Sequence, residues 1–341
     1  MRDIRIDVLR GVLILTVVLG HTNFLPKPLL NIIYSFHMPS FFLLSGYLFS
    51  VDSQTAVSTR IIGKFKRLII PAWVLGIICG IPFLIGLIIS PSLDALMVFL
   101  TKLAGTLGGY PTWSNTFNCT PLWFLFSLFM VEVIAISITA RWKKIYILFL
   151  IGVVGVILSL YVKFYTPFNI ATSLSGMIFF AVGAYVRKLG CLEKLIGIIP
   201  AFLSFVIFSA IYSLCVMNVN MASNTLGIGF GVLPSIICAI CGFIICLNSA
   251  VMISKVSYAS RAMSWLGVNT LAIIAFDYYA NNIILEAHYY AGVTSYWEVN
   301  FVLKVILLSF AAYIVSSIPV LNRFVNGRKI CQAKNNAQEV R

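Results

Sequence analysis

Charged side chains are scarce in this sequence: they make up 10% of the 341 residues, whereas hydrophobic residues make up 60%. A soluble domain needs far more polar surface to cover itself, so this shortage of charge excludes one. Apolar stretches of about 20 residues recur along the chain, each long enough to cross a hydrocarbon core of about 30 Å as a helix. We therefore expect an all-α membrane protein, a polytopic helical bundle in the lipid bilayer.

Acidic residues are the scarcest charges, with 10 Asp and Glu against 24 Lys and Arg, which gives a formal net charge of +14. The basic residues are scattered between apolar runs and form no long tract, so membrane topology explains them better than a nucleic-acid partner. The eight cysteines lie mostly inside apolar runs, and the pair Cys238-x-x-Cys241 has no second pair to complete a metal site. We expect neither nucleic-acid binding nor a metal ion.

The apolar runs predict about ten transmembrane helices. The first run follows basic residues, as in a signal peptide, but it lacks a small-residue cleavage site, so we expect a retained first span. The predicted spans are 8–25, 30–50, 68–90, 121–140, 145–163, 170–187, 195–216, 225–249, 265–287 and 300–321.

Lysine and arginine test this count, because cytoplasmic segments of membrane proteins collect them. With the N-terminus inside, the inner segments hold 20 of the 24 basic residues. The outer segments hold only Lys27, Lys102, Lys163 and Lys304. This alternation predicts that both termini are cytoplasmic. We expect one transmembrane domain over residues 1–325 and a disordered cytoplasmic tail over residues 326–341.

The longest outer connection, residues 91–120, begins with leucines at helical spacing from Leu93 onward, which predicts an interfacial amphipathic helix. It ends in aromatic residues that include Trp113. Aromatic side chains at this depth most often anchor a membrane protein at the headgroup boundary. The alternative is that their faces stack on a sugar.

The first span begins with Asp7 and Arg10 and ends in His21. Eleven helical steps bring His21 back to within roughly 20° of Arg10, about 16 Å further along the axis. Asp7, three residues before Arg10, is placed to be its ion-pair partner. Arg10 either snorkels to lipid phosphate or serves the site; His21 either makes a buried hydrogen bond or acts as a general base near neutral pH.

The second span carries His37, followed two residues later by Pro39. Counting from the outer boundary, His37 lies about 10 Å deep and His21 about 6 Å deep, so both imidazoles can face one chamber if the two helices pack as a hairpin. Pro39 predicts a kink where that chamber opens. The alternative is a kink with a buried polar contact and no function.

Further polar residues stand within or beside the spans. Lys64 and Arg67 form a two-cation face suited to phosphate groups, although positive-inside anchoring explains them equally well. Glu132 and Asp277 fall near the middle of their spans, where charge is costly. They are expected to pair with Arg10, to orient a histidine or to relay protons.

Several segments together resemble the membrane-bound acyltransferase-3 family. The resemblance begins with Arg10-x10-His21, continues through the segment 36–48, Lys64-x-x-Arg67 and the segment 121–125, and includes later blocks around Gly183 and Trp265. It is closest to the short, fucose 4-O-acetylase-like members, which lack an appended extracytoplasmic domain. Two positions depart from the family pattern: Lys64 replaces the first arginine of a paired motif, and Asp277 stands where many relatives have histidine.

The resemblance implies an O-acetyltransferase of a bacterial inner membrane that acts on an O-antigen, capsule or exopolysaccharide, with acetyl-CoA as donor substrate and no tightly bound cofactor. In this hypothesis Lys64, Arg67 and Arg10 meet the phosphates of acyl-CoA, and His21 takes the proton from a sugar hydroxyl. The residues expected to be catalytic are His21, Arg10 and His37, and Ser45 or His37 is expected to support the oxyanion. The other supporting residues are Asp7, Glu132 and Asp277, with Trp113 and Trp123 as acceptor contacts. The competing hypotheses are a transporter or flippase of lipid-linked sugars, which uses the acids and histidines as a proton path, and a catalytically silent scaffold.

Overall fold

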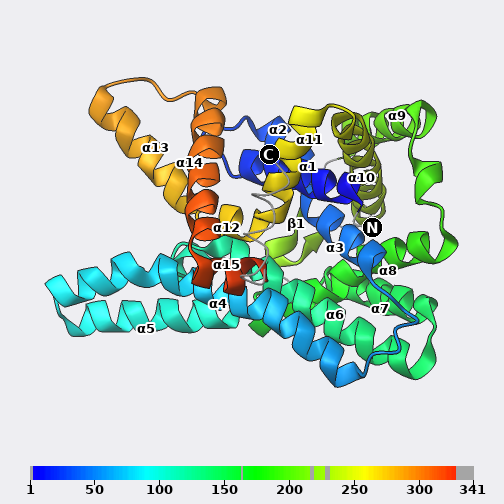
Figure 1. Cartoon of the computed structure of the whole chain (residues 1–341), viewed down its shortest axis with the longest axis horizontal. Helices are drawn as coiled ribbons and strands as arrows, with labels where there is room; N and C mark the ends of the chain where they lie inside the picture. The colour runs from blue at the N-terminus through cyan, green and yellow to red at the C-terminus, as the bar shows by residue number, and fades with distance from the viewer. Residues whose placement is uncertain (1–2, 163, 216–218, 227–230, 328–341) are drawn as a thin grey trace, which may run out of the picture.

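In a computed structural model the chain folds into a helical bundle (Figure 1). The structure describes residues 3–162, 164–215, 219–226 and 231–327. In these ranges the only sheet is a hairpin of β1 (Val219–Asn220) and β2 (Thr225–Leu226), which pair antiparallel. The prediction of an all-α membrane protein is confirmed. Most of the tail expected over residues 326–341 and the outer lysine Lys163 lie outside the described residues.

The α-helices differ widely in length, from the short α12 to the long α4. In chain order they are α1 (Ile4–Gly20), α2 (Lys27–Tyr34), α3 (His37–Leu48), α4 (Val57–Ile89), α5 (Leu93–Gly108), α6 (Trp123–Trp142), α7 (Ile145–Leu158), α8 (Ile170–Leu189), α9 (Ile198–Leu214), α10 (Val232–Ser254), α11 (Ser257–Val268), α12 (Thr270–Ala275), α13 (Asp277–Ala291), α14 (Trp297–Ser317) and α15 (Pro319–Asn326). Short 3-10 turns η1 (Trp113–Asn115), η2 (Thr120–Leu122), η3 (Pro167–Asn169), η4 (Leu192–Leu195) and η5 (Met221–Ser223) join some of them.

Six helical segments in the described part of the chain are long and apolar enough to cross a membrane, and they coincide with six of the ten predicted spans. The segments are Lys27–Leu48, Val57–Ile89, Thr120–Trp142, Pro167–Leu189, Val232–Ser254 and Trp297–Ser317. Of the other four predicted spans, three correspond to the shorter helices α1, α7 and α9, and the span 265–287 corresponds to a broken helix. The count of about ten therefore stays a prediction.

The span predicted over 265–287 is wrong as one continuous helix, because the chain interrupts it between α11, α12 and α13. The first interruption is at Asn269, whose side-chain amide donates to the carbonyl of Trp265, a contact that competes with regular helix. The second is at Phe276. Irregular backbone at membrane depth is tolerated where it lines a cavity rather than lipid.

Another interruption separates α2 from α3, at Ser35 and Phe36, so the predicted kink lies before Pro39 rather than at it. Pro39 is the third residue of α3. In the first turn of a helix the backbone N–H has no intrahelical partner, so proline costs little there. His37 thereby becomes the first residue of α3.

Helix α1 lies at the centre of the bundle (Figure 1), where it contacts α2, α3, α10, α11, α12 and α14. Two glycines let α1 and α11 approach closely. A Cβ at Gly11 would lie 2.0 Å from the carbonyl oxygen of Met263, and a Cβ at Gly267 would lie 2.0 Å from that of Asp7. Such close backbone contact through small residues is typical of helix pairs in membranes.

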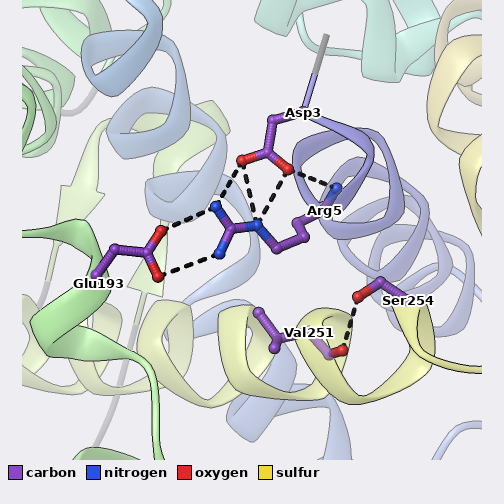
Figure 2. Close-up of polar contacts among 5 residues, drawn as sticks. All are labelled: Asp3, Arg5, Glu193, Val251 and Ser254. Carbon is purple, nitrogen blue, oxygen red and sulfur yellow. Dashed lines mark hydrogen bonds and ion pairs between the residues drawn. The ribbon is translucent and has the colours of Figure 1, made fainter. Parts of the chain in front are cut away.

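The start of α1 is tied to the turn between α8 and α9 (Figure 2). Asp3 caps the helix by accepting from the backbone N–H of Arg5. The Arg5 guanidinium lies 2.9 Å from Asp3 Oδ2 and 2.8 Å from Glu193 Oε1. The hydrogen bond from Arg5 lowers the pKa of Asp3. This bridge fixes the end of α1 opposite His21.

Helix α5 forms where the amphipathic helix was predicted and lies antiparallel beside the end of α4, both projecting from the bundle (Figure 1). Lys102 on α5 is buried, with 8% of its surface exposed, and its ammonium donates to the carbonyls of Trp113, Ser114 and Thr116. This lysine therefore holds the outer connection against α5 instead of facing solvent.

Candidate active site

One cavity of about 750 Å³ lies against the face of α1 that carries Arg10 and His21. Arg10, Ile14, Val17 and His21 line it, at intervals of four, three and four residues, which is the spacing of a single helix face. Because α1 is continuous from Ile4 to Gly20, the two polar side chains are about 16 Å apart along its axis. Hydrocarbon therefore does not separate them; they lie at the two ends of one space.

The interrupted helices supply other walls of this cavity. Tyr34 and His37 flank the break between α2 and α3, and both line it. Gly267, Val268, Thr270 and Leu271 line it around the break at Asn269. The irregular backbone thus faces an internal space, where its polar groups are tolerated.

Positive charge gathers around one end of the cavity. Arg10, Lys64, Lys66 and Arg67 all line it. Arg10 Nη1 lies 3.6 Å from Asp7 Oδ1, the ion pair that their spacing predicted. Guanidinium and ammonium groups at a cavity mouth suit phosphate oxygens.

Glu132 on α6 also lines this part of the cavity and is only 3% exposed. Its carboxylate pairs with the Lys64 ammonium and accepts a hydrogen bond of 2.9 Å from the Ser45 hydroxyl. A carboxylate removed from water needs such partners. The Lys64 ammonium is therefore paired with a protein carboxylate, whereas the sequence predicted that it would be available to bind a phosphate.

At the other end of the cavity, His21 meets a buried carboxylate. Its Nδ1 lies 3.4 Å from Oδ2 of Asp277, the first residue of α13 and 3% exposed. Asp277 Oδ1 lies 2.9 Å from the ammonium of Lys304, which is fully buried. An Nδ1 proton facing Asp277 leaves the lone pair on Nε2 of His21, as a general base requires.

His37 lies near His21 but has a different partner. It is 4% exposed, and its Nδ1 is 2.8 Å from the carbonyl oxygen of Ile33. Because a carbonyl only accepts, Nδ1 of His37 carries the proton and Nε2 is an acceptor in the neutral ring. The centroid of the Tyr34 ring lies 5.0 Å from that of His37 and 6.3 Å from that of His21, so Tyr34 neighbours both imidazoles.

Comparison with known sequences fits this arrangement. The sequence profile of the acyltransferase-3 family, described as an acyltransferase domain, matches residues 3–323. The chain belongs to this family. It is an integral membrane protein whose acyltransferase domain fills nearly its whole length.

A segment of 81 residues is 40% identical to the nodulation protein NolL of Sinorhizobium fredii (strain NBRC 101917 / NGR234). This segment covers 20% of the present chain and 22% of NolL, so the similarity is confined to about a fifth of each protein. No solved structure matches the chain.

The two tryptophans predicted as acceptor contacts of this acyltransferase-3 protein lie apart. Trp123 is 6% exposed and lines the cavity. Trp113 is 65% exposed, does not line it, and lies in the connection held by Lys102. A single cavity therefore brings together Arg10, His21, His37, Ser45, Lys64, Arg67, Trp123 and Glu132, whereas Asp7 and Asp277 reach it through their ion pairs with Arg10 and His21.

Sequence reasoning missed Lys304. It was counted as one of the outer lysines, but the structure buries it beside Asp277. The signal for it was its position inside the predicted span 300–321, where a cation is costly unless a carboxylate lies near. Asn281 was also missed; its side-chain amide donates to the backbone carbonyl of His21 over 2.7 Å.

Proposed function

We propose that this protein is a membrane O-acyltransferase that moves an acetyl group from cytoplasmic acetyl-CoA to a hydroxyl of an envelope or exported polysaccharide, in a bacterial inner membrane. The observation that carries the proposal is the single cavity with cations at one end and an imidazole paired with a carboxylate at the other. The family match supports acyl transfer. The positive-inside pattern supports donor entry from the cytoplasm.

In this proposal the phosphates of the donor bind at the cationic end. Arg67 and Lys66 are suited to the role, whereas Lys64 is already paired with Glu132. Arg10 can join them, because its guanidinium carries five N–H donors and its contact with Asp7 is long, at 3.6 Å. Arginine offers a planar fork of donors to phosphate oxygens. The thioester arm of acyl-CoA then extends along the face of α1 toward His21.

The reaction is an attack of a sugar hydroxyl oxygen on the thioester carbonyl carbon. Nε2 of His21 takes the hydroxyl proton as the new C–O bond forms. Collapse of the tetrahedral intermediate breaks the C–S bond, and the departing CoA sulfur takes up that proton. Asp277 fixes the ring of His21 and stabilises the imidazolium that forms transiently.

His37 and Ser45 were expected to support the oxyanion, but their protons point elsewhere. Nδ1–H of His37 donates to Ile33, and the hydroxyl of Ser45 donates to Glu132. His37 is better suited to accept a hydrogen bond, through Nε2, from a hydroxyl of the acceptor sugar. Trp123 offers an aromatic face to the same sugar.

A transporter or flippase of lipid-linked sugars remains the alternative, because Glu132 and both histidines line the cavity. A proton path through acids requires them to gain and lose protons in the membrane. Here Glu132 is paired with Lys64 and Asp277 with Lys304, so each carboxylate has a fixed counter-ion. This pairing favours the enzyme.

The two functions separate in one experiment. Purified protein is incubated with acetyl-CoA labelled in its acetyl group and with a bacterial surface polysaccharide, and label in the polysaccharide is counted. We expect transfer by the wild-type protein and none above background by His21→Ala, with Arg10→Ala strongly reduced. Movement of a lipid-linked sugar across vesicles without any transfer of label would support the flippase instead.

A further inference from the structure

Lys304 is the least expected charge in the molecule. It lies on α14, is fully buried, and is the only lysine among the largest fully buried side chains of the described residues. Its ammonium is 2.9 Å from Asp277 Oδ1, 2.9 Å from the carbonyl oxygen of His21 and 3.3 Å from that of Val18. It does not line the cavity. A lysine within a membrane helix costs about 2.5 to 3.5 kcal/mol to insert, so this placement needs a compensating role.

We propose that Lys304 is a positioning residue of the acyltransferase site: from outside the cavity it holds His21, the proposed base, in a fixed position. This inference rests on the proposed function. The lysine contacts neither of the substrates. It acts through the backbone of His21 on one side and through the carboxylate of Asp277 on the other.

The backbone contact follows from the end of α1. Helix α1 ends at Gly20 and leaves its last carbonyls without intrahelical donors. Lys304 donates to two of these oxygens, those of Val18 and His21, and Asn281 donates to that of His21 as well. A cation at a helix C-terminus also complements the helix dipole. The peptide that carries the imidazole is therefore held by α13 and α14 together.

The second contact acts on the imidazole ring of His21 through the side chain of Asp277. Asp277 uses Oδ2 toward His21 and Oδ1 toward Lys304, so one carboxylate links base and lysine. The lysine neutralises a carboxylate that would otherwise be an uncompensated buried charge. The Lys304 ammonium therefore holds both the backbone of His21, by a direct hydrogen bond, and its ring, through Asp277.

The geometric consequence is a fixed distance between Nε2 of His21 and the reacting hydroxyl. A shift of about 1 Å in a reacting group lowers a rate by about 100-fold. Loss of the lysine should therefore reduce kcat while leaving the KM for acetyl-CoA near its wild-type value, because the donor binds at the opposite end of the cavity. A lysine that merely stabilised the bundle would change the amount of folded protein and leave the kcat per folded molecule unchanged.

The test uses Lys304→Met, Lys304→Arg, Asp277→Asn and the double variant Lys304→Met/Asp277→Asn, with Lys255→Met as the control at an exposed lysine. Each protein is purified in detergent, and its kcat, KM for acetyl-CoA and thermal unfolding are measured. We expect about a 100-fold loss of kcat with unchanged KM in Lys304→Met, and partial rescue in Lys304→Arg, which keeps a cation. The double variant should unfold at a higher temperature than Lys304→Met, because no unpaired carboxylate is left, yet its kcat should stay low.

Two results would overturn the positioning role: a wild-type kcat in Lys304→Met, or recovery of kcat in the double variant together with its stability. The unfolding measurements do not depend on activity. If the wild-type protein transfers no acetyl group, the proposed function fails, and the buried pair is then judged by the thermal data alone. Additive effects of the two single substitutions on unfolding would show that Lys304 and Asp277 do not act as a pair.

Discussion

Removing the charge of Asp277 while keeping its shape tests the proposed base most sharply. At the 3.4 Å between His21 Nδ1 and Asp277 Oδ2, and with an effective dielectric constant of about 20, a carboxylate attracts a protonated imidazole by about 5 kcal/mol. The amide oxygen of asparagine can still accept a hydrogen bond from the protonated ring, which is worth about 1.5 to 3 kcal/mol, so the substitution keeps roughly half of this attraction. The remaining loss, about 2.5 kcal/mol in the transition state, corresponds to about a 70-fold lower kcat for Asp277→Asn.

The assay is acetyl transfer by purified protein at saturating acetyl-CoA, normalised to the amount of folded protein. The KM for acetyl-CoA should change little, because Asp277 does not line the cavity. Glu286→Gln is the matched control, since it removes the same charge from an exposed position of the same helix. A folded Asp277→Asn protein with wild-type kcat would refute the role of Asp277, and so would an equal loss in the control.

Three further predictions concern the donor end and the packing of α1. Arg67→Ala should raise the KM for acetyl-CoA about tenfold, as expected for one lost charge-assisted hydrogen bond, whereas Arg141→Ala on the exposed end of α6 should not. Glu132→Gln should lower the thermal unfolding temperature, because it leaves the half-buried Lys64 without its counter-ion; an unchanged unfolding temperature would contradict a stabilising role of this pair. Gly11→Ala should destabilise the protein by about 1 to 3 kcal/mol in chemical denaturation, because the added methyl group meets the backbone of α11. Gly63→Ala inside α4, with open space around it, should instead stabilise the protein by up to about 1 kcal/mol.

The parts of the site that lie on one helix could be predicted from the sequence. The spacing of Arg10 and His21 fixes their shared face, and the spacing of Asp7 and Arg10 fixes their ion pair, because helix geometry alone relates them. Membrane insertion followed from composition for the same reason: it depends on no tertiary contact.

The parts that depend on contacts between helices could not be predicted in this way. Lys64 pairs with Glu132 and Asp277 with Lys304 across different helices, and hydropathy says nothing about which faces meet. The interruption at Asn269 was not predicted, since it lies in an apolar stretch that reads as a continuous span, and the kink predicted at Pro39 lies instead at Ser35 and Phe36. They are stable because they border a cavity, which is a property of the assembled bundle.

The central claim is that His21 acts as the base at the end of the cavity remote from the donor cations. It is tested most directly by comparing His21→Gln with the wild-type protein in two measurements, equilibrium binding of CoA and single-turnover transfer of the acetyl group. We predict an unchanged Kd for CoA and a transfer rate at least about 100-fold lower, the smaller end of the range for loss of a general base. Transfer at the wild-type rate by a folded His21→Gln protein would contradict it.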